Sequence, residues 1–251
     1  MAENKHSLVA YFDILGYQSF LKNNSALETA EKVFQLVKSS PKEAIKHWSN
    51  PDSLKDDQDW KIVIDSIQSL VFSDTIVVSC PIAESGPTEL QIALLAGVAK
   101  NISFSMFTNG LPLRGVITMG SFIFEDTCIA GRAVVDAHSL SQTLDVAGVA
   151  FSPILSKYMD EHPLEISKGK SLWNLLHPYY LFPLKNQSEL KVRVVTWNDL
   201  NKEADSTKQV REAFWKWEKD IPISADNKVH NTAKMLDFFK LHFQSKIPEK
   251  K

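Results

Sequence analysis

Residues 8–20, LVAYFDILGYQSF, and the shorter stretch 70–80, LVFSDTIVVSC, decide the fold of this chain. Both are rich in apolar, β-branched and aromatic residues, which is typical of buried strands. Each carries one carboxylate where the apolar character stops, Asp13 in the first and Asp74 in the second. A carboxylate beside a buried strand is costly unless its charge is compensated, and two such groups on neighbouring strands repel each other. The two stretches therefore predict a divalent-metal site built from Asp13 and Asp74.

The composition is that of an ordinary globular protein, with 251 residues of which 44% are hydrophobic and 23% charged. A formal net charge of −2 argues against a dedicated nucleic-acid or membrane-surface binder. The sequence has no apolar run near the roughly 20 residues that span a bilayer, and its start, MAENKHS, lacks the apolar core of a signal peptide. We therefore expect a cytoplasmic protein. Cys80 and Cys128 lie in apolar stretches and are expected to be buried, reduced thiols.

The residue pattern predicts strands and helices in the order β, α, β, β, α, β. The expected elements are a strand over 7–12, a turn at Gly16, a helical pair over 17–37 broken near Asn23 and Asn24, an irregular or helical insertion over 39–59, strand character over 61–67 and 68–72, a strand over 75–80, a helix from the Thr88 and Gln91 capping box to Gly110, a strand pair over 113–119 and 121–125 around Gly120, and a helix after Gly131. An edge strand over 191–197 and amphipathic helices over 204–218 and 226–244 follow.

This order predicts an α/β (α+β) fold with a ferredoxin-like βαββαβ core, a central antiparallel sheet, an extra hairpin and C-terminal helices. In that topology the first and third strands are antiparallel neighbours, which brings Asp13 next to Asp74. We expect the C-terminal helices to pack on the core or on a partner subunit.

Two carboxylates that hold Mg²⁺ or Mn²⁺ against a triphosphate are typical equipment for attack at phosphorus. Free N–H groups of a helix start after Asp13 suit phosphate oxygens, and Arg114 supplies a cation. The alternatives are that Asp13 caps the following helix, that Asp74 sits in a β-turn, and that Arg114 forms an ordinary surface ion pair. For His138, packing on a helix face is the expected role. The sequence contains no GxSxG, P-loop or GxGxxG motif.

Four segments in order, YFDILGY (11–17), FSDTIVV (72–78), LRGVITMG (113–120) and GRAVVDAHSL (131–140), resemble the class III nucleotidyl cyclases. The resemblance is closest to the bacterial pyrimidine cyclases of the Pycsar anti-phage systems, which make cyclic UMP or cyclic CMP. It covers roughly the first 150 residues, with a softer match at NTAKMLDFF (231–239). It implies a catalytic domain, for which we expect residues 1–200, followed by a helical extension over 201–251.

The resemblance also implies a head-to-tail homodimer with active sites at the interface, where the ribose 3′ hydroxyl attacks the α-phosphorus and pyrophosphate leaves. Asp13 and Asp74 match the family's metal-binding aspartates, which hold two Mg²⁺ or Mn²⁺ ions, and the backbone carbonyl of Ile14 matches a further metal contact. The neighbouring residues expected to contact the nucleotide are Phe12, Ile14, Leu15, Gly16 and Tyr17.

The chain departs from the purine cyclases at the residues that complete their site. Those enzymes carry an asparagine and an arginine where this chain has Val135 and Ser139, and their adenine-selecting positions align with Leu70 and Cys128. These departures favour UTP, or less so CTP, as the substrate, with Arg114 as the candidate for the missing positive charge. The product would be an anti-phage signal for a separate effector.

The alternative is a catalytically silent cyclase-fold module that binds nucleotide or a partner and regulates by dimerising. Val135 and Ser139 favour it, as does Ser141, which stands where the pyrimidine enzymes often show a glutamate. The two aspartates count against it.

Overall fold

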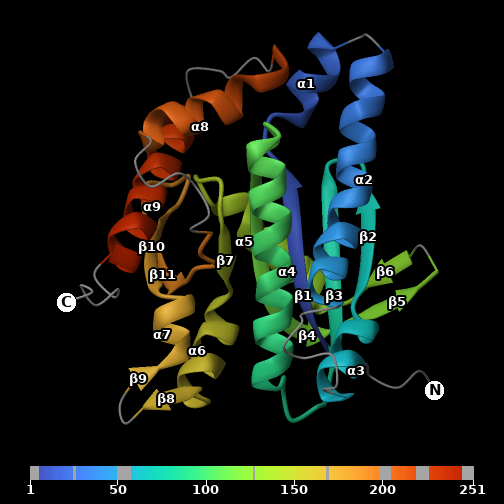
Figure 1. Cartoon of the computed structure of the whole chain (residues 1–251), viewed down its shortest axis with the longest axis vertical. Coiled ribbons are helices and arrows are strands. Elements are labelled where there is room, and N and C mark those ends of the chain that lie inside the picture. The colour runs from blue at the N-terminus through green and yellow to red at the C-terminus, as the bar shows by residue number, and fades with distance from the viewer. Residues whose placement is uncertain are drawn as a thin grey trace.

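We describe the chain from a computed structural model, which places residues 6–24, 27–49, 58–126, 128–167, 170–197, 205–218 and 226–244. A five-stranded sheet in the order β2-β3-β1-β4-β7 runs through the centre, with helices on both of its faces (Figure 1). Its strands are β1 (His6–Ile14), β2 (Gln68–Phe72), β3 (Thr75–Ile82), β4 (Leu113–Ser121) and β7 (Val149–Phe151).

The central strand of the sheet is β1, which pairs antiparallel with both β3 and β4. At one edge β2 pairs antiparallel with β3, and at the other edge β7 pairs parallel with β4. The first four strands thus have the order β2-β3-β1-β4 of a ferredoxin-like βαββαβ unit. This confirms the predicted fold class and the predicted pairing of the first and third strands.

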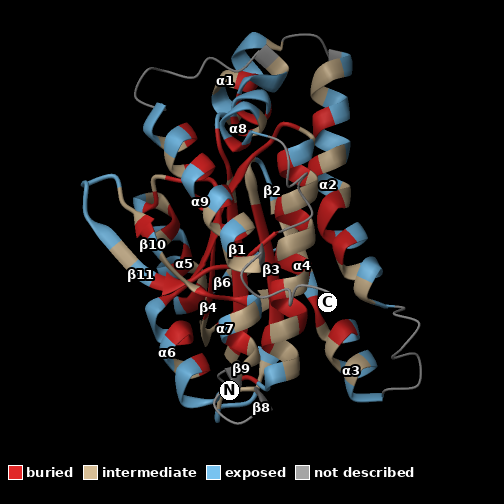
Figure 2. Ribbon diagram, turned by 60° about the vertical axis from the view of Figure 1, so that its left-hand side comes forward, coloured by how far each residue is buried: buried red, intermediate tan, exposed pale blue. Residues whose placement is uncertain are grey.

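Side chains of β1 alternate between two cores because successive residues of a strand point to opposite faces. Leu8, Ala10 and Phe12 belong to one buried cluster, whereas Val9 and Tyr11 belong to the other. The first cluster is covered by α1 (Tyr17–Asn23), α2 (Leu27–Ser49), α3 (Gln58–Ser66) and α4 (Glu89–Thr108). Figure 2 shows the buried residues along β1 and β3 and on the inner sides of these helices.

The second face of the sheet is covered by α5 (Arg132–Thr143), by the hairpin of β10 (Tyr179–Pro183) and β11 (Glu189–Arg193), and by α8 (Ser206–Trp215) and α9 (Asp226–Gln244). Val210 of α8 and Leu236 and Phe239 of α9 are nearly inaccessible and lie in the same cluster as Tyr11 of β1. The C-terminal helices therefore contribute to the core of the sheet. The division into residues 1–200 and 201–251 stays a prediction.

Smaller elements connect these layers. They are β5 (Ile123–Glu125), β6 (Cys128–Ala130), α6 (Pro153–Glu161), β8 (Glu165–Ser167), β9 (Lys170–Ser171), α7 (Leu172–Leu176) and a 3₁₀ turn (Lys216–Glu218).

Helix α4 shows how local sequence sets an element's bounds. Thr88 caps its start, accepting from the N–H of Gln91 at 3.2 Å, while the Gln91 side chain accepts from the N–H of Thr88 at 2.8 Å. Its end is followed by Gly110, whose φ of 82° suits glycine. Both signals were predicted and are confirmed. Among the described residues, α4 is the one helix long and apolar enough to cross a membrane, and 56% of its apolar window is buried inside the structure.

The expected strand over residues 61–67 is wrong, because α3 is a helix there. Ile64 is buried in the core and Val63 packs against it, whereas Ile62 is exposed. Burial of one helical stripe has overridden the β preference of these branched residues.

Two further expectations are wrong. The predicted hairpin around Gly120 does not form, since β4 runs through Gly120 to Ser121 and the next strand, β5, pairs with β6 instead. Cys128 is exposed at the start of β6, whereas Cys80 is buried as expected.

Candidate active site

The C-terminal end of β1 brings the two predicted aspartates together. Asp13 lies opposite Thr75 in the β1–β3 pairing, and the N–H of Ile14 donates to the backbone carbonyl of Asp74 at 2.9 Å. Ser73 and Asp74 form the two-residue turn between β2 and β3, with Ser73 at a φ of 53°. Asp74 therefore sits in a hairpin turn, as one alternative supposed, and that turn adjoins Asp13.

Arg114 lies on the other side of Asp13, opposite it in the β1–β4 pairing. Its Nη2 donates to Oδ2 of Asp13 at 2.5 Å and to Oε1 of Gln142 at 2.9 Å, and its Nη1 donates to the carbonyl of Leu144 at 3.4 Å. The side chains of Arg114 and Asp13 are 5% and 16% exposed. The alternative of an ordinary surface ion pair is therefore wrong. A buried pair of this kind fixes the carboxylate and compensates its charge.

Tyr11 reports the electrostatics of the site. Burial raises the pKa of the Tyr11 phenol, the Thr75 hydroxyl at 3.4 Å opposes this, and the nearby charges of Asp13 and Asp74 raise the pKa further. Both carboxylates thus act on one hydroxyl. The imidazole of His138, exposed on α5, lies edge-on against the Tyr11 ring, with centroids 5.5 Å apart, and its packing role stays a prediction.

The turn after Asp13 retains only part of its predicted phosphate-binding capacity. The N–H groups of Ile14 and Leu15 are used inside the fold, by the carbonyls of Asp74 and Pro112. Gly16, at a φ of 78°, is the N-cap of α1 and provides no side-chain cap. The alternative in which Asp13 caps the helix is therefore wrong. The backbone N–H groups that remain free for a ligand are those of the first turn of α1.

Phe12 and Tyr17, two further residues predicted to contact the nucleotide, differ in how they could meet a ligand. The Phe12 side chain is fully buried in the core on the opposite face of the sheet, so it offers a ligand nothing but backbone. Tyr17 packs against that same core with its ring 5.8 Å from that of Phe20, and the charge of Asp74 adds to burial in raising the Tyr17 pKa.

Lys185 lies near the site and was not predicted from the sequence. It lies in the turn between β10 and β11, where its N–H donates to the carbonyl of Thr143 at 2.9 Å. Burial lowers the pKa of the Lys185 ammonium, as do Arg114 and Lys228, while Asp145 and Asp13 raise it. Lys185 therefore lies within electrostatic reach of Asp13 and Arg114. Recognition of the β10–β11 hairpin would have been the only signal for it.

The donors at this site fit a hard divalent ion whose remaining ligands come from outside the protein. Mg²⁺ is usually held by one or two carboxylates together with substrate phosphates and water. Within the described residues, Oδ1 of Asp13 and the Asp74 carboxylate have neither a hydrogen bond nor an ion pair, and no group of three or more His, Cys, Asp or Glu residues gathers to hold an ion. The chemistry suits Mg²⁺ or Mn²⁺ bound through two carboxylates and not a closed protein cage.

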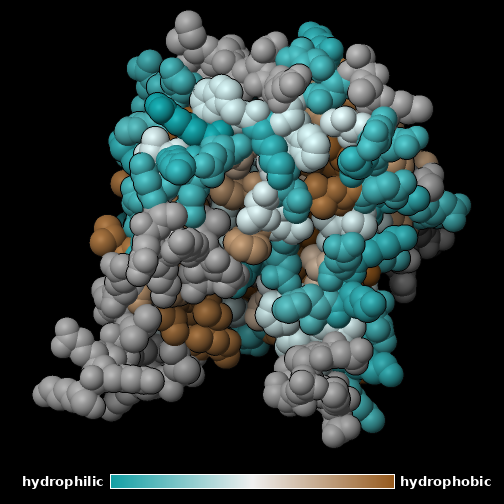
Figure 3. Space-filling model, turned by 45° about the horizontal axis from the view of Figure 1, so that its top comes forward, coloured by the Kyte–Doolittle hydropathy of each residue, from teal (hydrophilic) through white to brown (hydrophobic). Residues whose placement is uncertain are grey.

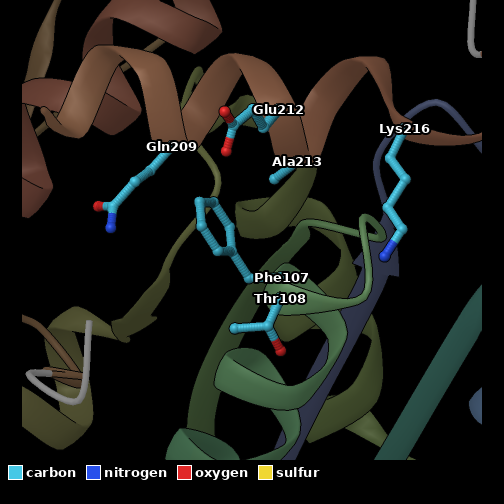
Figure 4. Close-up of a pocket in the computed structure, with 6 residues that line it drawn as sticks. All are labelled: Phe107, Thr108, Gln209, Glu212, Ala213 and Lys216. Atoms are coloured by element: carbon cyan, nitrogen blue, oxygen red, sulfur yellow. The ribbon is translucent and has the colours of Figure 1, made fainter. Parts of the chain in front are cut away.

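Two hollows in the described part of the surface are large enough to hold a ligand. A groove of about 950 Å³ runs along α5 and is lined by residues such as Arg132, Ser139 and Thr143. A smaller pocket of about 350 Å³ lies between α4 and α8, where Phe107 points toward α8 and Glu212 and Lys216 flank it (Figure 4). Figure 3 shows hydrophilic side chains over much of the face that α1 and α8 border, with hydrophobic patches between them.

Comparison with known proteins gives structural likenesses alone. No family model and no curated protein matches the chain. The adenylyl cyclase CyaB from P. aeruginosa is 14% identical, with a TM-score of 0.45 over 78% of this chain and 97% of that chain. An adenylate/guanylate cyclase/hydrolase from Silicibacter pomeroyi is 16% identical, with a TM-score of 0.43 over 77% and 96%. A class III adenylyl cyclase-like ATP-binding protein from Pseudomonas aeruginosa is 11% identical, with a TM-score of 0.39 over 66% of this chain and 38% of that chain. The fold assignment rests on the strand order itself.

Proposed function

We propose that this chain is a metal-dependent pyrimidine nucleotide cyclase that converts UTP, or less readily CTP, to the 3′,5′-cyclic monophosphate and pyrophosphate. In this reaction the ribose 3′ oxygen bonds to the α-phosphorus, the bond between the α-phosphorus and the oxygen bridging to the β-phosphate breaks, and the 3′ proton passes to solvent. The observation that carries the proposal is the pair of carboxylates, Asp13 and Asp74, on adjoining ends of β1 and the β2–β3 turn.

Bound Mg²⁺ or Mn²⁺ would neutralise charge on the attacking and leaving oxygens. Asp13 and Asp74 would hold the ions, and Arg114 keeps Asp13 in one orientation through the 2.5 Å contact. The backbone N–H groups at the start of α1 would take phosphate oxygens. Lys185 would bring its positive charge to the triphosphate tail, since it already lies within electrostatic reach of Asp13.

We further propose that the enzyme works as a homodimer with its sites at the interface. Val135 is 59% exposed on α5, and Ser139 lines the groove along the same helix. This is the helix on which the resembling purine enzymes carry their asparagine and arginine. A role in anti-phage defence and a separate effector that senses the cyclic product rest on that resemblance alone, whereas a cytoplasmic setting is proposed from the apolar pattern of the sequence.

One observation favours the rival function, a catalytically silent nucleotide-binding or dimerisation module. The Arg114 guanidinium, the candidate for the missing cation, is 5% exposed and already bound to Asp13, Gln142 and Leu144. A silent module predicts nucleotide binding or dimerisation without turnover.

The test is to incubate the purified, folded protein with each of the four nucleoside triphosphates and Mn²⁺ and to identify the products by mass spectrometry. Cyclic UMP or cyclic CMP together with pyrophosphate is expected. A cyclic purine product would overturn the pyrimidine assignment. No cyclic product from any of the four would reject the enzyme and leave the silent module.

A further inference from the structure

The segment that joins α5 to β7, residues 144–148, is buried although it forms no helix and only one isolated bridge. Leu144, Val146 and Ala147 are at most 1% exposed. A buried irregular segment must have partners for its backbone N–H and C=O groups, because unpaired polar groups in a core are costly. Its partners therefore say which parts of the molecule fix it.

On one side the partners come from helix α9. The hydroxyl of Thr232 accepts from the N–H of Ala147 at 2.9 Å and donates to the carbonyl of Lys228 at 2.6 Å. The side-chain amide of Asn231 donates to the carbonyl of Asp145 at 3.0 Å. Lys228 adds an ion pair, its Nζ lying 3.5 Å from Oδ1 of Asp145. Three residues within one turn of α9 thus hold the segment.

On the other side the segment contacts Arg114 and its neighbour. The carbonyl of Leu144 accepts from Nη1 of Arg114 at 3.4 Å, and the carbonyl of Gly148 accepts from the N–H of Gly115 at 2.9 Å. Gln142, just before the segment, accepts from Nη2 of Arg114 at 2.9 Å. The Arg114 guanidinium, which donates to Asp13, therefore also donates to the segment that α9 fixes.

We propose that α9 is a positioning element of the candidate active site. Asn231 and Thr232 fix segment 144–148, and that segment holds Arg114 against Asp13. This deepens the proposed function and rests on it. Reactive groups must be held to within about 0.5 Å of their productive geometry by the residues behind them, so a hydrogen bond on α9 can matter to chemistry at β1. The segment NTAKMLDFF, part of the family resemblance, begins at Asn231. Its first two residues, Asn231 and Thr232, would position the segment 144–148, whereas its apolar residues pack in the core.

Packing and positioning by α9 can be separated by substitution. The apolar contacts of α9 come from other residues, Met235, Leu236 and Phe239, which are nearly inaccessible. Replacing the Thr232 hydroxyl by a methyl group keeps the shape of the side chain and leaves those contacts in place. Thr232→Val should therefore disturb the segment more than the helix.

The first experiment compares Thr232→Val, Thr232→Ser and Asn231→Leu with the control Lys234→Gln, an exposed position on the same helix. In the full chain, kcat of Thr232→Val and Asn231→Leu should fall about tenfold, with KM for the nucleotide changed less than about twofold. Half-maximal activity should require about tenfold more Mn²⁺, as expected when a ligand loses its supporting contact. Thr232→Ser, which keeps the hydroxyl, should restore both values. Equal kcat in Thr232→Val and the control would overturn the proposal.

The second experiment needs no activity. Denaturant midpoints are measured for Thr232→Val, Gln142→Ala and their double variant, and for the matched set with Asn174→Ala, which removes the corresponding acceptor of the other buried arginine, Arg193. The shifts should be non-additive for Thr232 with Gln142 and additive for Thr232 with Asn174. Additive shifts in both sets would contradict the positioning role. Coupling in a wild-type protein that makes no cyclic product would reject the proposed function alone.

Discussion

Two buried arginines, Arg114 and Arg193, each pair with a carboxylate at the same Nη2–oxygen distance of 2.5 Å, and the two carboxylates, Asp13 and Asp160, differ in how many hydrogen bonds they accept. Both arginines are nearly inaccessible, and both leave a buried Nε without a hydrogen bond. In the second pair, Tyr179 occupies the other oxygen of Asp160, and Arg193 also donates to Asn174 and to the carbonyl of His177.

The Asp13 pair is left open. Its Oδ1 has no partner among the described residues, and a second carboxylate, Asp74, adjoins it. An ion pair with a structural role is most stable when every polar atom has a hydrogen-bond partner, whereas a metal site must keep carboxylate oxygens free for the ion. The comparison teaches that an unused oxygen in a buried pair, more than the pair itself, marks the candidate site.

The largest expected difference between the two pairs is that between the variants Asp13→Asn and Asp160→Asn. Asp13→Asn should lower cyclase activity by roughly 10²- to 10³-fold, because a charged ligand at the reacting phosphate is lost. Asp160→Asn should leave kcat within about twofold and lower stability instead. Initial rates and denaturant unfolding of the two variants check this, with circular dichroism to establish that each is folded. Similar activity losses in both would erase the distinction.

Arg193→Met tests the Arg193–Asp160 pair by removing the arginine instead of the carboxylate. Breaking a buried pair costs on the order of 3 to 5 kcal/mol of unfolding free energy, and the lower end is expected here because the Asp160 side chain is 42% exposed. The control Arg211→Met, at an exposed position of α8, should shift stability by less than about 0.5 kcal/mol. Equal shifts in urea unfolding would show that Arg193 contributes no more than a surface residue.

His177 makes the stability of the region around Arg193 depend on pH. Burial lowers the pKa of its imidazole to about 3, with Arg193 adding to the effect. The unfolded chain binds a proton on this histidine below its ordinary pKa of 6.5 and the folded chain does not, so stability is lost as pH falls from 6.5 toward 3.

Between pH 6.5 and 4 the loss assigned to His177 is about 3 kcal/mol at about 1.4 kcal/mol per pKa unit. Thermal unfolding at several pH values measures it. His177→Phe should flatten the slope, whereas the control His47→Phe, exposed on α2, should keep it. An unchanged slope in His177→Phe would assign the acid sensitivity to other groups.

Lys185→Met probes the rim of the open site and has the smallest expected effect. Loss of one phosphate contact should raise KM for the nucleotide about tenfold, with kcat nearly unchanged, since the contact is made before and during reaction. Lys185→Arg should restore KM because it keeps the charge. Lys191→Met, an exposed lysine of the same hairpin, is the matched control. A KM unaffected by Lys185→Met would remove this residue from the site.

The sheet was predictable because its determinants are local. Short continuous apolar strands, the Thr88–Gln91 box and Gly110 specify the βαββαβ order, and that order brings β1 beside β3. Residues 61–67 misled because their branched residues favour a strand in isolation, whereas the helix is stabilised by burying Ile64 against α4 and the sheet.

The site was predictable only as far as strand pairing reaches. The positions of Asp13, Asp74 and Arg114 follow from strand register, since Asp13 and Arg114 lie near strand ends and Asp74 lies in the turn before β3. Gln142, Lys185 and Thr232 reach the site through an irregular segment, a hairpin turn and a C-terminal helix. Their positions depend on long-range packing that periodicity and turn signals do not encode.

The most direct test of the central claim, that open carboxylates at the end of β1 carry metal-dependent cyclisation, is the rate of cyclic product formation by Asp74→Asn. UTP and CTP are supplied with saturating Mn²⁺, and Asp65→Asn, an exposed aspartate on α3, is the matched control. Activity in Asp74→Asn should fall by about 10²-fold or more, with the control equal to wild type. Wild-type rates in Asp74→Asn would contradict the claim.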